Sequence, residues 1–314
     1  MYKIVLLCLW ALLAGSVRVS AESLCIVSYN VENLFHPKHD TIITNEGIIE
    51  KDDHEWTPEG ERHWSYTRYF RKVENIARVL TNIGEWEGVD IVGLQEVENA
   101  LCVKRLCYTL RKGEYDYVHY ESPDRRGIDV ALIYKKSRVD TIRTRAIRVD
   151  LGEQTTRDIL YVCAKVEKDT LHFFVCHMPS QRGGKAESEW KRKRAKQVLQ
   201  QVVDSVFRVD SEAKIIVMGD MNEEGCMNAE MSGLADKRMR GDGTHKYNGR
   251  WTFLDHFLVC PSLDSLSQAL VYNAEWIMET DEKYLGVKPK RTYNGFVYQN
   301  GFSDHLPIVL HIGL

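Results

Sequence analysis

Short apolar runs recur along the chain, and glycine, aspartate or asparagine bounds most of them. They are rich in valine, isoleucine, phenylalanine and tyrosine, which is typical of strands in a sheet. We predict strands at Leu24–Tyr29, Val89–Leu94, Tyr115–Tyr120, Asp129–Tyr134, Ile159–Val166, Leu171–His177, Lys214–Met218, Thr252–Cys260 and Leu306–Ile312. The fifth and sixth of these runs are joined by four residues, so we expect them to form an antiparallel hairpin.

Three segments instead repeat apolar residues at the spacing of a helix. The first runs from Tyr69 to Ile83, the second over about Ala100–Leu110 and the third from about Ala186 to Phe207. Helices interspersed among many strands predict an α/β fold in which two sheets are flanked by helices. No repeat, low-complexity tract or linker divides the chain, so we expect a single domain over residues 22–314.

The segment 36–64 is polar, charged and weakly periodic. Long connections of this kind are usually functional or mobile. Because it follows a strand whose end carries candidate chemistry, we expect it to form a rim that faces the substrate.

The first 21 residues have the pattern of a signal peptide. Met1–Lys3 is a positive start, Ile4–Ala14 is apolar, and Val19–Ala21 offers small residues for cleavage. The apolar run is well short of the roughly 20 residues that span a bilayer. We therefore predict export to the periplasm, cell surface or medium, with no membrane-spanning segment in the mature chain. Lipid modification is the alternative, although neither Cys8 nor Cys25 has the small-residue context for it.

Charge and cysteine content narrow the possible functions. Without residues 1–21 the chain holds 40 basic and 45 acidic residues. A protein that binds nucleic acid mainly by neutralising phosphates is usually basic, so this balance disfavours a tight DNA binder. Seven cysteines remain, with no zinc spacing and no disulfide framework. Cys163 and Cys176 lie on consecutive predicted strands and are the pair that could face each other.

Polar residues repeatedly stand where a predicted strand begins or ends. They are Asn30, Glu96, His177, Asp220 with Asn222, and Asp304 with His305. Any one of them alone is better explained as a turn former or a solvated group. If the strands are neighbours, however, their ends bring carboxylates, amides and imidazoles into one pocket.

These residues lie in motifs that resemble, in order, those of the endonuclease/exonuclease/phosphatase superfamily. The motifs are Ser28-Tyr29-Asn30-Val31-Glu32-Asn33, Gln95-Glu96-Val97, His177-Met178-Pro179-Ser180, Gly219-Asp220-Met221-Asn222 and Ser303-Asp304-His305. The resemblance implies a four-layered α/β/β/α sandwich with two mixed, largely antiparallel sheets. It also implies a hydrolase of phosphoric esters that uses Mg²⁺ or Mn²⁺.

The resemblance further implies roles for the motif residues. Glu96, Asn30 and Asp304 would bind the metal, because hard cations prefer oxygen ligands. His305 would be the general base, with Asp304 orienting its ring.

The remaining motif residues would act on the water and the phosphate. Asp220 and Asn222 would position the attacking water and a phosphate oxygen. His177, protonated against the anionic substrate, would stabilise the transition state.

Three softer assignments come from neighbouring segments. In Asp124–Leu132, Arg126 would bind a phosphate and Asp129 would stand at the pocket wall; an ordinary solvated turn is the alternative. Arg182 would contact phosphate from a glycine-rich rim. The segment around Asp255 resembles one in which an aspartate partners a site histidine, and we expect Asp255 to orient His177.

The substrate class stays open between several phosphoesters. An extracellular nuclease suits export and is our first expectation. A phosphodiesterase or phosphatase that acts on lipid head groups or sugar phosphates is the alternative. An inert binding protein of the same fold is disfavoured by the intact Glu96, Asp220 and His305. We expect a monomer.

Overall fold

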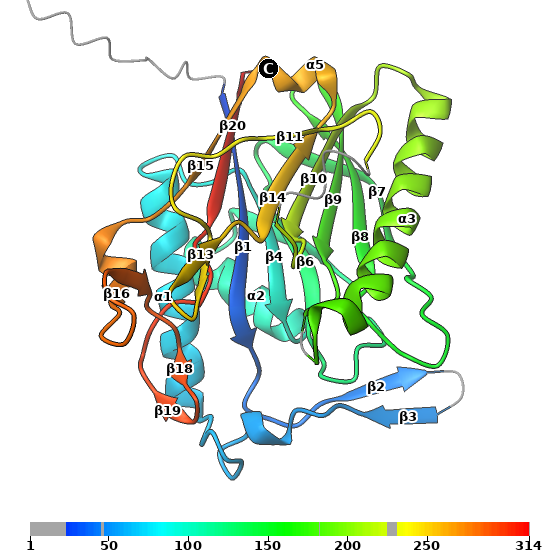
Figure 1. Ribbon diagram of the computed structural model, residues 1–314. Coiled ribbons are helices and arrows are strands. Elements are labelled where there is room, and N and C mark those ends of the chain that lie inside the picture. Colours follow the sequence, from blue (N-terminus) through cyan, green and yellow to red (C-terminus); the bar gives the residue numbers. More distant parts are fainter. Residues whose placement is uncertain (1–22, 45–46, 182, 225–230, 314) are drawn as a thin grey trace, which may run out of the picture.

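The computed structural model describes residues 23–44, 47–181, 183–224 and 231–313. The predicted signal peptide and Arg182 lie outside these residues. The described chain folds into two six-stranded sheets that pack face to face, with the long helices outside them (Figure 1). This arrangement confirms the predicted α/β fold with two mixed, largely antiparallel sheets.

The first sheet contains both the first and the last of the long strands. Its order is β15 (Ser267–Val271), β20 (Ile308–Gly313), β1 (Ser23–Leu34), β4 (Ile91–Val97), β6 (Asp129–Lys135) and β5 (Tyr115–His119). Strands β1 and β4 are parallel, whereas every other neighbouring pair in this sheet is antiparallel.

The second sheet repeats the same pattern of directions. Its order is β11 (Ala235–Asp236), β14 (Asp255–Val259), β10 (Lys214–Asp220), β9 (Asp169–His177), β8 (Ile159–Val166) and β7 (Val139–Ile147). Here the parallel pair is β9 with β10. Each sheet thus has one parallel junction at its centre.

Helices cover the outer faces of both sheets. The helices α1 (Tyr66–Gly84) and α2 (Ala100–Leu110) pack on the first sheet, and α3 (Lys185–Val209) lies along the second (Figure 1). Ser65 and Asn99 cap the first two helices by accepting backbone N–H groups. Within the described ranges, no helix is long and apolar enough to cross a bilayer.

Smaller elements lie around the two sheets. They are the hairpins β2 (Thr41–Thr44) with β3 (Gly47–Glu50), β12 (His245–Tyr247) with β13 (Arg250–Thr252), β16 (Met278–Thr280) with β17 (Val287–Pro289) and β18 (Tyr293–Asn294) with β19 (Val297–Tyr298), the short helix α5 (Pro261–Asp264), and the 3₁₀ turns η1 (His54–Trp56) and η2 (Glu275–Ile277). The polar segment 36–64 therefore contains the β2–β3 hairpin and η1.

Most of the predicted elements are confirmed, but two predictions need correction. The single strand predicted over Thr252–Cys260 is divided, because the Thr244 hydroxyl accepts the backbone N–H groups of Leu254 and Asp255 between β13 and β14. The Cys163–Cys176 pairing does not occur: every cysteine in the described part of the chain is a free thiol. Cys163 instead stands opposite His172 in the β8–β9 ladder.

The two sheets approach each other closely where β4 faces β9 and β10. A Cβ atom on Gly93 would lie 2.7 Å from the sulfur of Met218 and 3.3 Å from a methyl group of Val175. The side chains between the sheets are fully buried. Because glycine leaves no gap at this point, the ends of β4 and β10 are held at a fixed separation.

A second glycine fixes the end of β10. Gly219 has a φ of 143°, and a Cβ there would lie 1.9 Å from the Cys176 carbonyl oxygen.

We expect Gly219→Ala to lower the free energy of unfolding by more than about 3 kcal/mol, because the parallel β9–β10 ladder must move apart. Gly152→Ala is the matched control: its φ is also positive at 72°, but nothing lies within 4 Å of the added carbon. It should destabilise by about 1 kcal/mol. Urea unfolding measures both, and equal losses would contradict this account.

Candidate active site

The carboxyl ends of the two central parallel pairs meet at one end of the sandwich. Because β1 and β4 run together, as do β9 and β10, each pair delivers its polar ends to the same side. Asn30 lies on β1, Glu96 on β4, His177 at the end of β9 and Asp220 at the end of β10. His305 joins them from the segment that leads into β20.

The predicted residues lie within a few ångströms of one another. Asn30 Nδ2 donates to Asp220 Oδ2 at 3.1 Å and to Glu96 Oε1 at 3.4 Å. His177 Nε2 stands 3.6 Å from the same Asp220 oxygen and 3.8 Å from Glu96 Oε1. His305 Nε2 approaches that Asp220 oxygen to 3.8 Å. Five residues, one from each of the five motifs, therefore form one cluster centred on Asp220.

Strained backbone positions coincide with this cluster. Glu96, Asn33 and Asn222 have φ angles of 64°, 57° and 51°. Asn33 holds Glu96 by donating its N–H to Oε2 at 3.0 Å. The Asn222 backbone N–H donates to Asp220 Oδ1 at 2.8 Å. Asparagine adopts this conformation readily, whereas a glutamate such as Glu96 does so less often, and such positions concentrate at functional sites.

The side chain of Asn222 has structural contacts of its own. The Asn222 Nδ2 donates to the Met178 carbonyl oxygen at 3.0 Å. Gln181 Nε2 donates to the backbone carbonyl oxygen of Asn222 at 2.7 Å. We expected both residues to position a water and a phosphate oxygen. In the structure, Asn222 also holds Asp220 in place through its backbone N–H.

The partner of Asp255 differs from the expected one. Its Oδ2 lies 2.8 Å from His305 Nδ1, so Asp255 orients His305 and not His177. Both side chains are buried. Burial lowers the His305 pKa, but the carboxylates of Asp255 and Asp220 outweigh it and raise the pKa well above the usual range. The His305 ring is thus more basic than a free imidazole, and Asp255 holds it by Nδ1 so that Nε2 is its other, outward nitrogen.

Asp304 also has another partner than the one expected. Its Oδ2 accepts from an Arg291 nitrogen at 2.9 Å, and Arg291 Nε lies 3.2 Å from Glu32. The orienting role given to Asp304 belongs to Asp255. Arg291 compensates two carboxylates at the back of the site, and nothing in its sequence surroundings marks it for that role.

The surroundings of His177 favour its neutral form, whereas the sequence led us to expect a ring protonated against the substrate. Burial lowers its pKa well below the usual range, and the positive charges of Arg157, Arg126 and His305 lower it further. Arg157 is itself buried, donating to the Met178 carbonyl oxygen at 2.7 Å and to Asp124 at 3.0 Å. The cationic charge beside His177 therefore comes from two arginines, of which sequence reasoning found only Arg126.

The donor set fits a hard divalent cation. Glu96 and Asp220 present two carboxylates around Asn30 Nδ2, and Mg²⁺ prefers such oxygen ligands. Burial raises the Asp220 pKa to about 7, with Asp255 and Glu96 adding repulsion that a cation would relieve. The Asn30 side-chain oxygen accepts the Glu32 N–H at 3.0 Å, while its Nδ2 donates to the two carboxylates.

A cleft of about 610 Å³ leads to Glu96. Arg126, which we expected to bind a phosphate, lies in its wall, and the 36–64 segment supplies most of the rest. The lining residues are Asn33, Phe35, Asp52, His54, Glu55, Trp56, Gly60, Glu61, Arg62, Glu96 and Arg126. Asp129 is not among them: it stands 3.4 Å from His119 and accepts the Ser122 N–H, so its side chain is used inside β5 and β6.

Comparison with known families and structures agrees with this fold. A model of the Endonuclease/Exonuclease/phosphatase family matches residues 25–313. No curated protein sequence matches.

Solved structures share the fold at low identity. A protein of that family from Bacteroides thetaiotaomicron is 18% identical, with a TM-score of 0.60 over 92% of this chain and 97% of its own. Truncated TDP2 from Caenorhabditis elegans is 14% identical, with a TM-score of 0.61 over 93% of this chain and 98% of its own. A mannosyl-6-phosphatase from B. thetaiotaomicron is 17% identical, with a TM-score of 0.56 over 91% of this chain and 98% of its own.

The Asp255–His305 pair predicts a specific loss of activity. We expect Asp255→Asn to lower turnover of bis-p-nitrophenyl phosphate by on the order of 10³–10⁴-fold, because the amide no longer fixes the imidazole tautomer. Asp236→Asn is the matched control, since Asp236 pairs with the neighbouring His256 at 3.0 Å, away from the cluster. It should stay within about threefold of wild type. Comparable losses in both variants would count against the assignment.

Proposed function

Because the chain belongs to the endonuclease/exonuclease/phosphatase family, a family of phosphoester hydrolases, we propose that it is an exported, divalent-metal-dependent phosphoesterase. The observation that carries the proposal is the cluster of Glu96, Asp220, His177 and His305, built from the ends of both sheets. Export is proposed from the N-terminal sequence alone.

His305 is the proposed general base. Asp255 holds its Nδ1 at 2.8 Å, which leaves Nε2 facing the Asp220 side of the site. A water between Nε2 and Asp220 would be aligned by the carboxylate while the imidazole takes its proton. Asp255 and Asp220 make His305 more basic than a free imidazole, and the ring acts as the base in the form in which Nε2 is unprotonated.

Glu96 and Asp220 are the proposed metal ligands. Mg²⁺ or Mn²⁺ bound there would neutralise charge that develops on the phosphoryl oxygens and on the leaving group. Glu96 is the more exposed of the two, with 17% of its side chain accessible, and it faces the cleft through which a phosphate would enter.

Three further groups would stabilise the phosphoryl oxygens. His177, whose pKa burial lowers, would donate an N–H hydrogen bond, and Arg126 would bring a positive charge from the cleft wall. Arg157 would be a positioning residue. It donates hydrogen bonds to Asp124 and to the carbonyl oxygen of Met178, the residue that follows His177.

The charge of the cleft favours a small phosphoester over a polynucleotide. Asp52, Glu55 and Glu61 line it beside Glu96, while Arg62 and Arg126 are its basic residues. Arg62 is already paired with Glu55 at 3.0 Å. A polyanion would meet several carboxylates in this wall, whereas a single phosphate on a neutral, hydroxyl-bearing group would not. We therefore place a small phosphoester such as a sugar phosphate ahead of the nuclease expected from the sequence.

Metal removal and two substitutions test the reaction. Chelation with EDTA should abolish hydrolysis, and Mg²⁺ or Mn²⁺ should restore it. We expect His305→Ala and Asp220→Asn each to lower turnover by at least about 10³-fold, because the base or the water-aligning carboxylate is lost. His63→Asn, which changes an exposed histidine outside the site, should leave turnover unchanged. Wild-type turnover by His305→Ala would refute the mechanism.

A substrate panel tests the class. The purified protein is assayed with sugar phosphates, DNA, RNA, sphingomyelin, phosphoinositides and bis-p-nitrophenyl phosphate, each with both metals. Preference for a sugar phosphate would support the charge argument. Faster hydrolysis of DNA or RNA at physiological salt would contradict it and favour the nuclease.

A further inference from the structure

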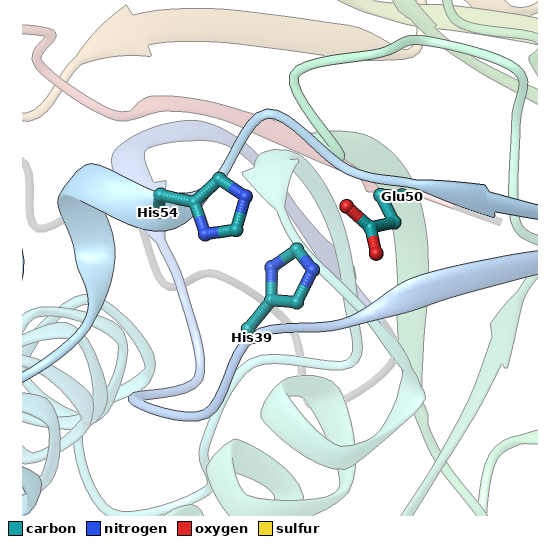
Figure 2. Close-up of side chains that lie close together, drawn as sticks. All are labelled: His39, Glu50 and His54. Atoms are coloured by element: carbon teal, nitrogen blue, oxygen red, sulfur yellow. The ribbon is translucent and has the colours of Figure 1, made fainter.

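Two histidines and a glutamate converge beside the cleft, outside the catalytic cluster. His39 precedes β2, Glu50 ends β3, and His54 begins η1. Each offers one ligand atom, and these atoms all lie within 4.8 Å of one another. Figure 2 shows the Glu50 carboxylate reaching from β3 toward the two rings. The proposed reaction uses none of the three.

His39 is held in the orientation of a metal ligand. Its Nδ1 contacts Asp53 Oδ1, and Asp53 is 1% exposed and fixed by the Asp40 N–H, which donates to its other oxygen at 2.9 Å. A carboxylate at Nδ1 selects the tautomer that carries its proton there, so Nε2 keeps a free lone pair. That Nε2 is buried and has no hydrogen-bond partner within the described part of the chain.

The second imidazole lies against the first. The His39 and His54 rings stack with centroids 4.2 Å apart and planes 17° from parallel. A structural His–Asp pair would explain His39 and Asp53, but it explains neither the buried unpaired nitrogen nor the adjacent ring and carboxylate. Unpaired buried polar atoms are rare and usually mark a missing partner.

We propose that His39, Glu50 and His54 bind a transition-metal dication of the Zn²⁺ class. Two imidazoles and one carboxylate are a donor set for Zn²⁺, which leaves a fourth position open. Mg²⁺ prefers oxygen ligands, so the two centres differ in the ion they select. The carboxylate of Asp53 behind His39 is the outer-shell partner that ligating histidines usually have.

An ion at this position would join three parts of the 36–64 segment. It would bind the residue before the hairpin, the last residue of the hairpin and the start of η1. His54 also lines the cleft that leads to Glu96. The ion would therefore fasten the cleft wall and place positive charge beside Asp52 and Glu55.

Metal titration of the whole mature protein tests the proposal. Zn²⁺ and Co²⁺ are added in the presence of excess Mg²⁺, and the readouts are bound metal by mass spectrometry and the visible spectrum of Co²⁺. We expect one tightly bound equivalent in wild type and in Glu96→Gln. The His39→Asn and His54→Asn variants should bind at least tenfold more weakly, and Asp53→Asn about 10–100-fold more weakly.

His63→Asn is the matched control, since His63 is an exposed histidine of the same segment. It should bind like wild type. Because His54 is exposed, its variant tests the site even if a change at His39 disturbs folding. Amide exchange over residues 39–54 should slow with Zn²⁺ in wild type only.

Two results would overturn the proposal. One is a wild-type protein that retains no Zn²⁺ or Co²⁺ once Mg²⁺ is in excess. The other is a His54→Asn variant that binds as wild type does. Neither result bears on the phosphoesterase proposal, because that site is tested through Glu96, Asp220 and His305.

Discussion

The close contact between the two sheets is the constraint on which the site depends. Gly93 of β4 packs directly against Met218 and Val175, so the sheets cannot separate or slide without opening a gap or forcing a clash. Glu96 stands three residues beyond that contact on one side, and Asp220 two residues beyond it on the other. The distance between the two carboxylates is therefore set by core packing.

Backbone strain at the site is held by hydrogen bonds from neighbouring motifs. The Glu96 carboxylate accepts the backbone N–H of Asn33. The Asp220 carboxylate accepts the backbone N–H of Asn222 and the side-chain amide of Asn30, so amide donors fix both carboxylates. Such pre-organisation is worth most where charge develops in a buried setting. It also explains why asparagines recur in motifs whose chemistry is carried by acids and imidazoles.

The sequence contains enough to predict the fold and the members of the cluster, because both depend on local patterns. Buried strands are apolar runs, and their polar ends stand out by contrast. Pairing is not local. Asp255 and Asp304 are both aspartates near a histidine, and only the arrangement of β14 beside β10 and of Arg291 beside Asp304 decides which one orients His305.

Charge states and small hairpins were beyond sequence reasoning for related reasons. The lowered pKa of His177 depends on its burial and on the buried Arg157, which no motif marks. Strand β7 is an edge strand with mostly accessible residues, so it lacks a clear apolar alternation. The β2–β3 hairpin is short and polar, and its position is visible only once the sheet ends are in place.

Strand β20 determines when during synthesis the site can be completed. It pairs with β1 on one side and β15 on the other, and His305 stands just before it. A nascent chain that has completed the second sheet already possesses Glu96, Asp220 and Asp255 but still lacks the base and the strand that closes β1. In the proposed mechanism, the site is therefore incomplete until the segment that carries His305 has been synthesised.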